Sequence, residues 1–203
     1  MVFVFDVDDT ISETDKYSEY YLDKFFEQNH LLYQKISPIA RYAEQKYAWS
    51  HMTALDWYKK YGDQMMLEFP VKKNVKNLFD FLHQNGHKIV IATARSTEWH
   101  QKPKEVTECW LKLNGLYYDK LYVDCDKIEV CEAENADVFV DDDIGLCVDV
   151  KRYFANKKDV KVLVATTEYN KWIKIPNYVT RINDFKEIKD KLSHPNVQNS
   201  KEL

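Results

Sequence analysis

The chain opens with a short apolar run that turns acidic without a break. Val2-Phe3-Val4-Phe5 is followed at once by Asp6-Val7-Asp8-Asp9-Thr10. An unbroken apolar run, without the alternation of a half-exposed strand, is typical of a strand covered on both faces of a parallel sheet. We therefore predict a buried strand over 2–5, whose carboxyl end delivers Asp6 and Asp8.

Similar apolar runs recur from residue 88 onward, separated by helical patterns. A helical face begins at Val75 and Gly86 ends it, as is common for helix termini. Strands that alternate with helices of this length imply right-handed crossovers and a parallel sheet. The later strands are predicted over 88–92, 121–123, 138–140 and 160–165, and the later helices over 103–113, 127–134 and 146–154. The predicted fold class is α/β.

Residues 13–75 interrupt this alternation with helical patterns alone. Capping residues at 12–15 precede a predicted helix that ends near His30, and two more helices are predicted over about 38–49 and 53–68. The segment is rich in aromatic residues, most of which should pack a small helical bundle. A few could face the carboxyl edge of the sheet and stack on a base or sugar ring. We predict a sheet domain over 1–12 and 76–191, a helical insertion over 13–75, and a frayed polar tail over 192–203.

Composition then excludes several classes of function. The 203 residues are 45% hydrophobic, enough for one domain with an insertion, and the net charge of −4 offers no basic surface to a nucleic-acid polymer. No segment approaches the roughly 20 apolar residues of a membrane span. The apolar start lacks a basic leader, and the four cysteines form no C-x-x-C pair. We expect a cytoplasmic protein with reduced thiols.

The scarcity of glycine excludes two common phosphate-binding loops. Gly62, Gly86, Gly115 and Gly145 lie too far apart to build a P-loop or a dinucleotide fingerprint. Any bound phosphate must be held by other groups.

Four predicted strand ends carry such groups. Asp6 and Asp8 follow the first strand, Thr93-Ala94-Arg95 the second, Lys127 the third and Asp141-Asp142-Asp143 the fourth. The carboxyl ends of parallel strands share one edge of the sheet, where ligands bind in open α/β folds. Carboxylates so close together are costly unless a cation or a shared proton relieves them. An all-oxygen donor set favours Mg²⁺ over Zn²⁺, which prefers His or Cys.

These residue types suit phosphoryl transfer. Ionised Asp6 can attack phosphorus to form an aspartyl-phosphate. Asp8 can protonate the leaving alkoxide and later activate water, a role for which its pKa should be raised by the neighbouring charge. The Thr93 hydroxyl, the Ala94 N–H and the Lys127 ammonium can hold the phosphoryl oxygens. Arg95 either reaches the substrate or pairs with an acid.

In this order, the motifs resemble those of the haloacid dehalogenase superfamily of phosphatases, over about 1–12 and 76–190. The resemblance implies a Rossmann-like parallel sheet of strand order 5-4-1-2-3 and a helical cap over the catalytic edge. It implies Mg²⁺ held by Asp6, by the backbone carbonyl of Asp8 and by the pair Asp141 and Asp142. Within that pair, Asp142 would contact the metal and Asp141 would orient it or Lys127, although three consecutive acids leave this assignment open.

A second similarity concerns the end of the chain. Residues 168–170 and 181–185 are similar to the ends of 5'(3')-deoxyribonucleotidase-like members. Those enzymes place a base-stacking aromatic shortly after the first motif, where this chain has Thr14 and Asp15, with Tyr17 as the first ring. The resemblance thus implies a Mg²⁺-dependent phosphomonoesterase for a small phosphorylated metabolite, either a nucleoside monophosphate or a sugar phosphate. A phosphomutase and a non-catalytic phosphate- or partner-binding module are the alternatives, and Asp8 argues against the module.

Overall fold

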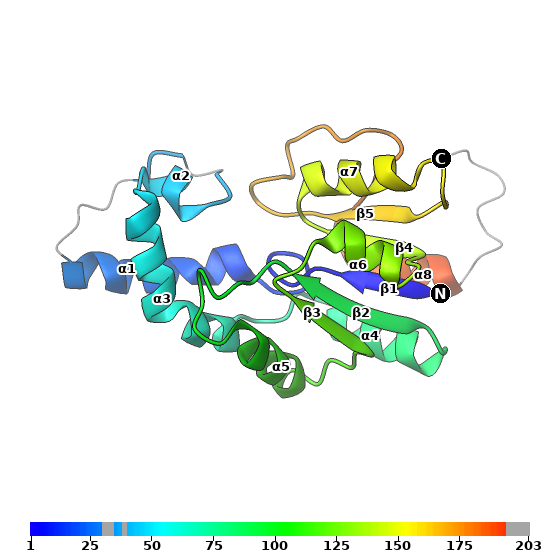
Figure 1. The fold of residues 1–203 in the computed structure, drawn as a ribbon, viewed down its shortest axis with the longest axis horizontal. Helices are drawn as coiled ribbons and strands as arrows, with labels where there is room; N and C mark the ends of the chain where they lie inside the picture. Colours follow the sequence, from blue (N-terminus) through cyan, green and yellow to red (C-terminus); the bar gives the residue numbers. More distant parts are fainter. Residues whose placement is uncertain (30–34, 38–39, 194–203) are drawn as a thin grey trace.

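Six strands form one sheet in the computed structural model of the chain, which describes residues 1–29, 35–37 and 40–193 (Figure 1). The strand order is β3-β2-β1-β4-β5-β6, and every neighbouring pair is parallel. The strands are β1 Val2–Phe5, β2 Lys88–Thr93, β3 Lys120–Val123, β4 Val138–Asp141, β5 Lys161–Ala165 and β6 Thr180–Ile182. The Rossmann-like sheet and the order 5-4-1-2-3 are confirmed, with β6 added beside β5.

The sixth strand is absent from the sequence prediction. Its three residues are Thr-Arg-Ile, and only Ile182 is buried. A run this short, with two partly exposed polar residues, has neither an apolar core nor an alternating pattern. Its pairing with β5 comes from the tertiary structure.

Strand β1 lies at the centre of the sheet, covered on both faces. Phe3 is in register with Ile89 of β2 and with Val138 of β4. Phe3, Val4 and Phe5 have no exposed surface. This double cover explains why the first strand is an unbroken apolar run.

Five helices provide that cover. Helices α4 (Val75–Gln84), α5 (Pro103–Leu113) and α8 (Lys186–Ser193) share one core with the sheet, and α6 (Lys127–Ala133) and α7 (Ile144–Phe154) share the other. Successive residues of β1 alternate between the two cores, with Phe3 and Phe5 in the first and Val4 in the second. The sheet is therefore the middle layer of three.

The three remaining helices lie beyond the carboxyl ends of β1 and β2 (Figure 1). They are α1 (Thr14–Asn29), α2 (Ala43–Tyr47) and α3 (His51–Glu68), and they form a separate aromatic core. The chain passes from the sheet to these helices after β1 and returns to the sheet before α4. The two connecting segments pair in an antiparallel bridge between Ser12 and Val71. The division into a core over 1–12 and 76–191 and a cap over 13–75 stays a prediction.

Two helix limits differ from the prediction. Helix α2 covers only Ala43–Tyr47 instead of 38–49, because Ala48 adopts a left-handed φ of 52° that ends it. Residues 38–39, at the predicted start, lie outside the described residues. Helix α8 continues to Ser193, into the tail predicted from 192, and residues 194–203 also lie outside the described part.

Two further observations concern membranes and thiols. Within the described ranges, no helix combines the length and the apolar character needed to cross a membrane. The four cysteines form no disulfide.

Candidate active site

The ends of β1 and β4 bring three acids together. The Asp6 N–H donates to the carbonyl of Val140 at 3.0 Å, so the pairing of these neighbouring strands continues up to the first acid. Asp6, Asp141 and Asp142 are all buried. Each offers a carboxylate oxygen, and the three oxygens lie within 4.8 Å of one another.

Lys127 sits among these acids. It begins α6, directly after the N-cap residue Asp126. Its Nζ lies 2.6 Å from Asp6 Oδ1 and 2.8 Å from Asp141 Oδ2. Burial alone would lower the pKa of Lys127, but the carboxylates of Asp6 and Asp141 outweigh burial and raise it. Lys127 is therefore a fixed positive charge beside the predicted nucleophile.

One lysine does not neutralise the cluster. Burial raises the pKa of Asp6, against the lowering effect of Lys127. Burial and the charge of Asp6 raise the pKa of Asp141 to about 8. Buried carboxylates that resist ionisation to this degree call for more positive charge.

A hard divalent cation fits this donor set. Converging carboxylate oxygens are the ligands that Mg²⁺ uses beside phosphate. Among the residues that the structure describes, Asp6, Asp141 and Asp142 are the one such group of potential metal ligands. The carboxylate of Asp8 does not belong to it, and the ligand role predicted for Asp8 concerns its backbone carbonyl.

The structure separates the three consecutive acids after β4. Asp143 caps α7 by accepting a hydrogen bond from a backbone N–H in the first turn at 3.1 Å. Asp141 accepts from Lys127 and, at 2.8 Å, from the Asp143 N–H, so both of its oxygens are held. This suits the orienting role for Asp141. The direct ligand role of Asp142 stays a prediction.

The environment of Asp8 corrects one prediction. Arg95 Nε and Nη2 each lie 2.7 Å from an Asp8 oxygen, which makes a bidentate pair, and the Thr14 hydroxyl donates to Asp8 at 2.8 Å. A third Arg95 nitrogen contacts the Thr107 hydroxyl at 3.0 Å. Burial would raise the pKa of Asp8, but Arg95 outweighs it and lowers the pKa to about 2. The expected raised pKa is wrong because the guanidinium, and not a second carboxylate, is the closest charge. Arg95 thus pairs with an acid.

The residues predicted to hold phosphate line one cavity with Asp6 and Asp8. This cavity, of about 630 Å³, includes Thr93, Ala94 and Lys127 in its wall. Thr93 ends β2 and is buried, and Ala94, one residue later, is exposed. The structure brings these side chains together, and their roles stay predictions.

Sequence analysis misses three residues around Asp142. Arg41 Nη2 lies 3.3 Å from Asp142 Oδ2, and Arg41 also pairs with Asp143. The Tyr169 hydroxyl donates to Asp142, and Asn170 Nδ2 donates to the Asp142 carbonyl at 2.9 Å. No local pattern singles out Arg41 in its loop. Tyr169 and Asn170 belong to the segment that carries the second similarity, which assigns them no function.

Another part of the cavity wall is formed by side chains of α3 and of the loop after β2, including Trp57, Tyr58, Trp99 and His100. The sequence analysis expects a few aromatic residues of the insertion at this edge, without saying which, and Trp57 and Tyr58 are such residues. Trp99 and His100 belong to the loop after β2, and no pattern in the sequence marks them.

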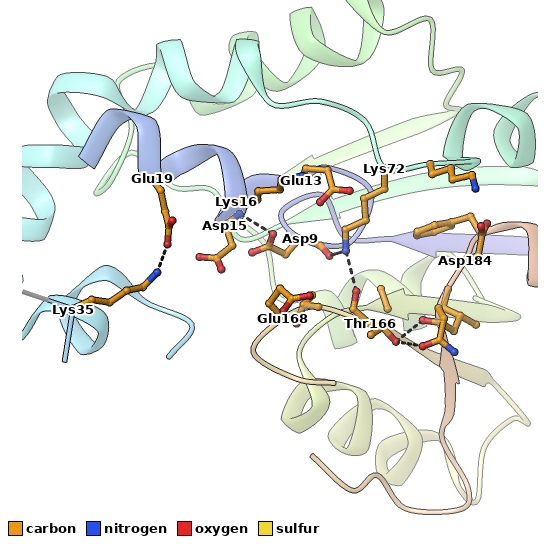
Figure 2. Close-up of a pocket in the computed structure, with 16 residues that line it drawn as sticks. Asp9, Glu13, Asp15, Lys16, Glu19, Lys35, Lys72, Thr166, Glu168 and Asp184 are labelled. Atoms are coloured by element: carbon orange, nitrogen blue, oxygen red, sulfur yellow. Dashed lines mark hydrogen bonds and ion pairs between the residues drawn. The ribbon is translucent and has the colours of Figure 1, made fainter. Parts of the chain in front are cut away.

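A second cleft, of about 580 Å³, lies beside the two crossings between the sheet and the insertion (Figure 2). Lys72 spans it, with Nζ held by the backbone carbonyls of Asp9 and, at 3.3 Å, Thr166. Asp9 borders both cavities. Because Asp6, Asp8 and Lys127 all line the first cavity and not this one, we assign the candidate chemistry to the first.

Comparisons with known proteins find similarity at the level of structure. No protein-family model matches the sequence, and no curated protein matches it significantly. The haloacid dehalogenase-like hydrolase SP0104 from Streptococcus pneumoniae superposes with a TM-score of 0.68 at 11% identity, covering 94% of this chain and 97% of its own. The magnesium-bound candidate HAD-hydrolase YfnB from Bacillus subtilis gives 0.63 at 16% identity, covering 95% and 98%. A candidate β-phosphoglucomutase from Thermotoga maritima gives 0.62 at 13% identity, covering 95% and 98%.

At these identities the comparison shows a shared fold. It covers the helical insertion as well as the sheet, since 94% or more of this chain is matched in each case. The closer similarity to deoxyribonucleotidases stays a prediction. The chain has the fold of haloacid dehalogenase-like hydrolases.

Proposed function

We propose that this protein is a Mg²⁺-dependent phosphomonoesterase that forms an aspartyl-phosphate on Asp6. The observation that carries the proposal is the convergence of Asp6 with Lys127, Asp141 and Asp142, at a point where Asp6 and Lys127 line one cavity. An acid with only a structural role at a strand end needs no buried lysine and no second acid pair. A carboxylate that attacks a phosphoryl dianion needs both, because the negative charges of the two groups must be neutralised.

In the first step, a carboxylate oxygen of Asp6 bonds to phosphorus as the bond to the leaving oxygen breaks. Lys127, the Thr93 hydroxyl and the Ala94 N–H are the groups that would hold the phosphoryl oxygens. Bound Mg²⁺ would neutralise charge between the acid cluster and these oxygens.

Asp8 is proposed to serve as the base of the second step. In that step water attacks phosphorus, Asp8 accepts a proton of the water, and phosphate leaves with Asp6 restored. In the structure Asp8 is ionised and paired with Arg95, which makes it a weak base, so this role requires the substrate complex to loosen the pair. For the first step, the leaving alkoxide needs a proton, so substrate binding must loosen the contact with Arg95 or bring the proton from solvent.

The substrate is proposed to be a small phosphorylated metabolite, rather than a nucleic-acid polymer or a membrane lipid. A nucleoside monophosphate follows from the similarity to deoxyribonucleotidases. A sugar phosphate is the second candidate, favoured by the structural likeness to a candidate β-phosphoglucomutase. That likeness also keeps a phosphomutase open, in which a second substrate replaces water. We also propose a cytoplasmic location, where free thiols such as the four cysteines of this chain stay reduced.

The test is hydrolysis of p-nitrophenyl phosphate with and without Mg²⁺. The native chain should release phosphate only with the metal, and Asp6→Asn should release none. Asp149→Asn is the matched control, because Asp149 is an exposed acid on α7, away from the site. Activity that survives Asp6→Asn would refute the covalent mechanism. A native chain that is inactive on every monoester tried would favour the non-catalytic binding module.

A further inference from the structure

The connection between β5 and β6 (166–179, orange in Figure 1) reaches back to the acid cluster. The Tyr169 hydroxyl donates to one carboxylate oxygen of Asp142, and Asn170 Nδ2 donates to the Asp142 carbonyl at 2.9 Å. The other carboxylate oxygen of Asp142 accepts from the Thr10 hydroxyl at 2.9 Å. A neutral hydroxyl therefore holds each oxygen of the predicted metal ligand.

Asn170 ties this connection to the ends of two strands. The residue is buried, and its Nδ2 also donates to the carbonyl of Ala165, the last residue of β5, at 2.8 Å. Because Asp142 directly follows β4, one side-chain amide joins the ends of neighbouring strands. Asn170 Oδ1 accepts from the Thr167 N–H at 2.9 Å. These contacts fix the backbone next to Tyr169.

Arg181 of β6 holds the same connection. Its Nη1 donates to Asn170 Oδ1 at 2.9 Å, and its Nη2 donates to the carbonyls of Asn170 and Ile173 at 3.2 and 2.8 Å. All three acceptors are neutral oxygens of the connection, which the rigid fork of a guanidinium can bind together. Arg181 therefore orders the turn from which Tyr169 extends to Asp142.

Tyr169 and Arg41 contact the same oxygen of Asp142 with opposite consequences for a cation. The charge of Arg41, at 3.3 Å, competes with a metal ion. The Tyr169 hydroxyl orients the carboxylate without neutralising it. Loss of a group that orients a metal ligand typically costs about 10- to 100-fold in metal affinity. Removing the Tyr169 hydroxyl should therefore weaken metal binding, whereas removing the charge of Arg41 should strengthen it.

We propose that Tyr169 is a positioning residue for the predicted metal ligand Asp142, and that Arg181 acts on Asp142 through Asn170 and Tyr169. The proposal rests on the proposed Mg²⁺-dependent function and adds the residues that keep Asp142 in place for the cation. Neither Tyr169 nor Arg181 lines the cavity that contains Asp6, so both act through Asp142 and not on the substrate. Strand β6 thereby has a function in the site, because it provides Arg181.

Isothermal titration calorimetry with Mg²⁺ and no substrate tests this role. Tyr169→Phe removes only the hydroxyl and should weaken Mg²⁺ binding by about tenfold or more. Tyr178→Phe is the matched control, because Tyr178 is an exposed tyrosine of the same connection, and its Mg²⁺ affinity should equal that of the native chain. Unchanged or tighter Mg²⁺ binding by Tyr169→Phe overturns the proposal.

A second pair of variants tests the path from Arg181. Arg181→Met should weaken Mg²⁺ binding by about threefold or more, and Lys174→Met, which removes an exposed cation of the same connection, should not. Arg181→Met and Tyr169→Phe together should weaken binding by less than the product of their separate effects, because a loosened turn no longer places the hydroxyl. Separate effects that multiply would overturn the path through Tyr169.

Urea unfolding in EDTA separates positioning from a structural role. Variants that lose stability in EDTA but bind Mg²⁺ like the native chain would overturn the proposal. In an active chain, Tyr169→Phe should raise the Mg²⁺ concentration needed for half-maximal turnover of p-nitrophenyl phosphate, while kcat at saturating Mg²⁺ stays close to that of the native chain.

The calorimetry does not depend on hydrolysis. If the native chain binds Mg²⁺ more tightly than Tyr169→Phe but hydrolyses no monoester, the proposed function fails and the positioning role stands. If the native chain hydrolyses monoesters with Mg²⁺ and the variants bind Mg²⁺ equally well, the positioning role fails and the phosphatase stands. A native chain that binds no Mg²⁺ overturns both.

Discussion

Replacing Arg95 by Met should destabilise the folded chain, because the bidentate pair with Asp8 would be lost. In the structure, Arg95 overcomes burial and lowers the pKa of Asp8 from 3.8 to about 2. A pKa difference of this size corresponds to about 2.4 kcal/mol of free energy that stabilises the ionised carboxylate in the folded chain. Since 33% of the Asp8 side chain is exposed, solvent screening reduces the figure to about 1–2 kcal/mol. We expect Arg95→Met to lower the free energy of unfolding at pH 7 by about 2 kcal/mol, once the hydrogen bond to Thr107 is included.

The effect should depend on pH in a defined direction. Above about pH 4, Asp8 is ionised in both the folded and the unfolded chain, and the contribution of the pair is fully present. As the pH falls from about 4 to about 2, the unfolded chain takes up the proton first, so the contribution is lost. The difference in stability between the native chain and Arg95→Met should therefore be constant from pH 7 to 5 and shrink below pH 4.

Urea unfolding followed by tryptophan fluorescence, with EDTA present, measures this difference at each pH. Arg152→Met is the matched control, because Arg152 is exposed on α7 and its contact with Asp149 is 3.7 Å long. We expect that control to stay within about 0.5 kcal/mol of the native chain. An Arg95→Met loss no larger than the control, or one that grows below pH 4, would refute the reasoning about Asp8.

Three other perturbations test neighbouring contacts. Lys127→Met should abolish turnover of p-nitrophenyl phosphate. It should also lower the free energy of unfolding by about 3–5 kcal/mol, because it leaves Asp6 and Asp141 without their buried cation. Turnover above a tenth of the native rate would contradict this prediction. Arg41→Gln should bind Mg²⁺ about threefold or more tightly in isothermal titration calorimetry, since Arg41 competes for Asp142, and unchanged affinity would show that it does not. Trp110→Phe should cost about 1–2 kcal/mol in urea unfolding, because the buried Nε1 donates to the Phe69 carbonyl at 2.7 Å; a cost below about 0.5 kcal/mol would disprove the importance of that bond.

Much of the fold can be predicted from local pattern. Strands covered on both faces are apolar throughout, so β1 and β2 are visible as runs, and the intervening helices imply a parallel sheet. Their carboxyl ends must share an edge, which places Asp6 near Lys127 and Thr93. β6 could not be predicted, because its three residues carry no periodic pattern and their pairing with β5 depends on the tertiary structure.

The details of the site depend on contacts between distant segments. The pairing of Asp8 with Arg95 joins residues 87 positions apart, and the direction of the pKa shift of Asp8 follows from that geometry alone. Tyr58 reaches the cavity because α3 folds over the sheet edge. Sequence spacing within the insertion predicts its packing face, but not which residues turn toward the catalytic edge.

The central claim is that Asp6 is transiently phosphorylated. The direct measurement is acid quenching of the native chain during turnover with Mg²⁺ and acetyl phosphate, followed by peptide mass spectrometry. The account predicts a phosphoryl group on Asp6 that is absent from Asp6→Asn and accumulates when Asp8→Asn slows the second step. Phosphorylation of a different residue, or rapid turnover without any phosphorylated peptide, would contradict it.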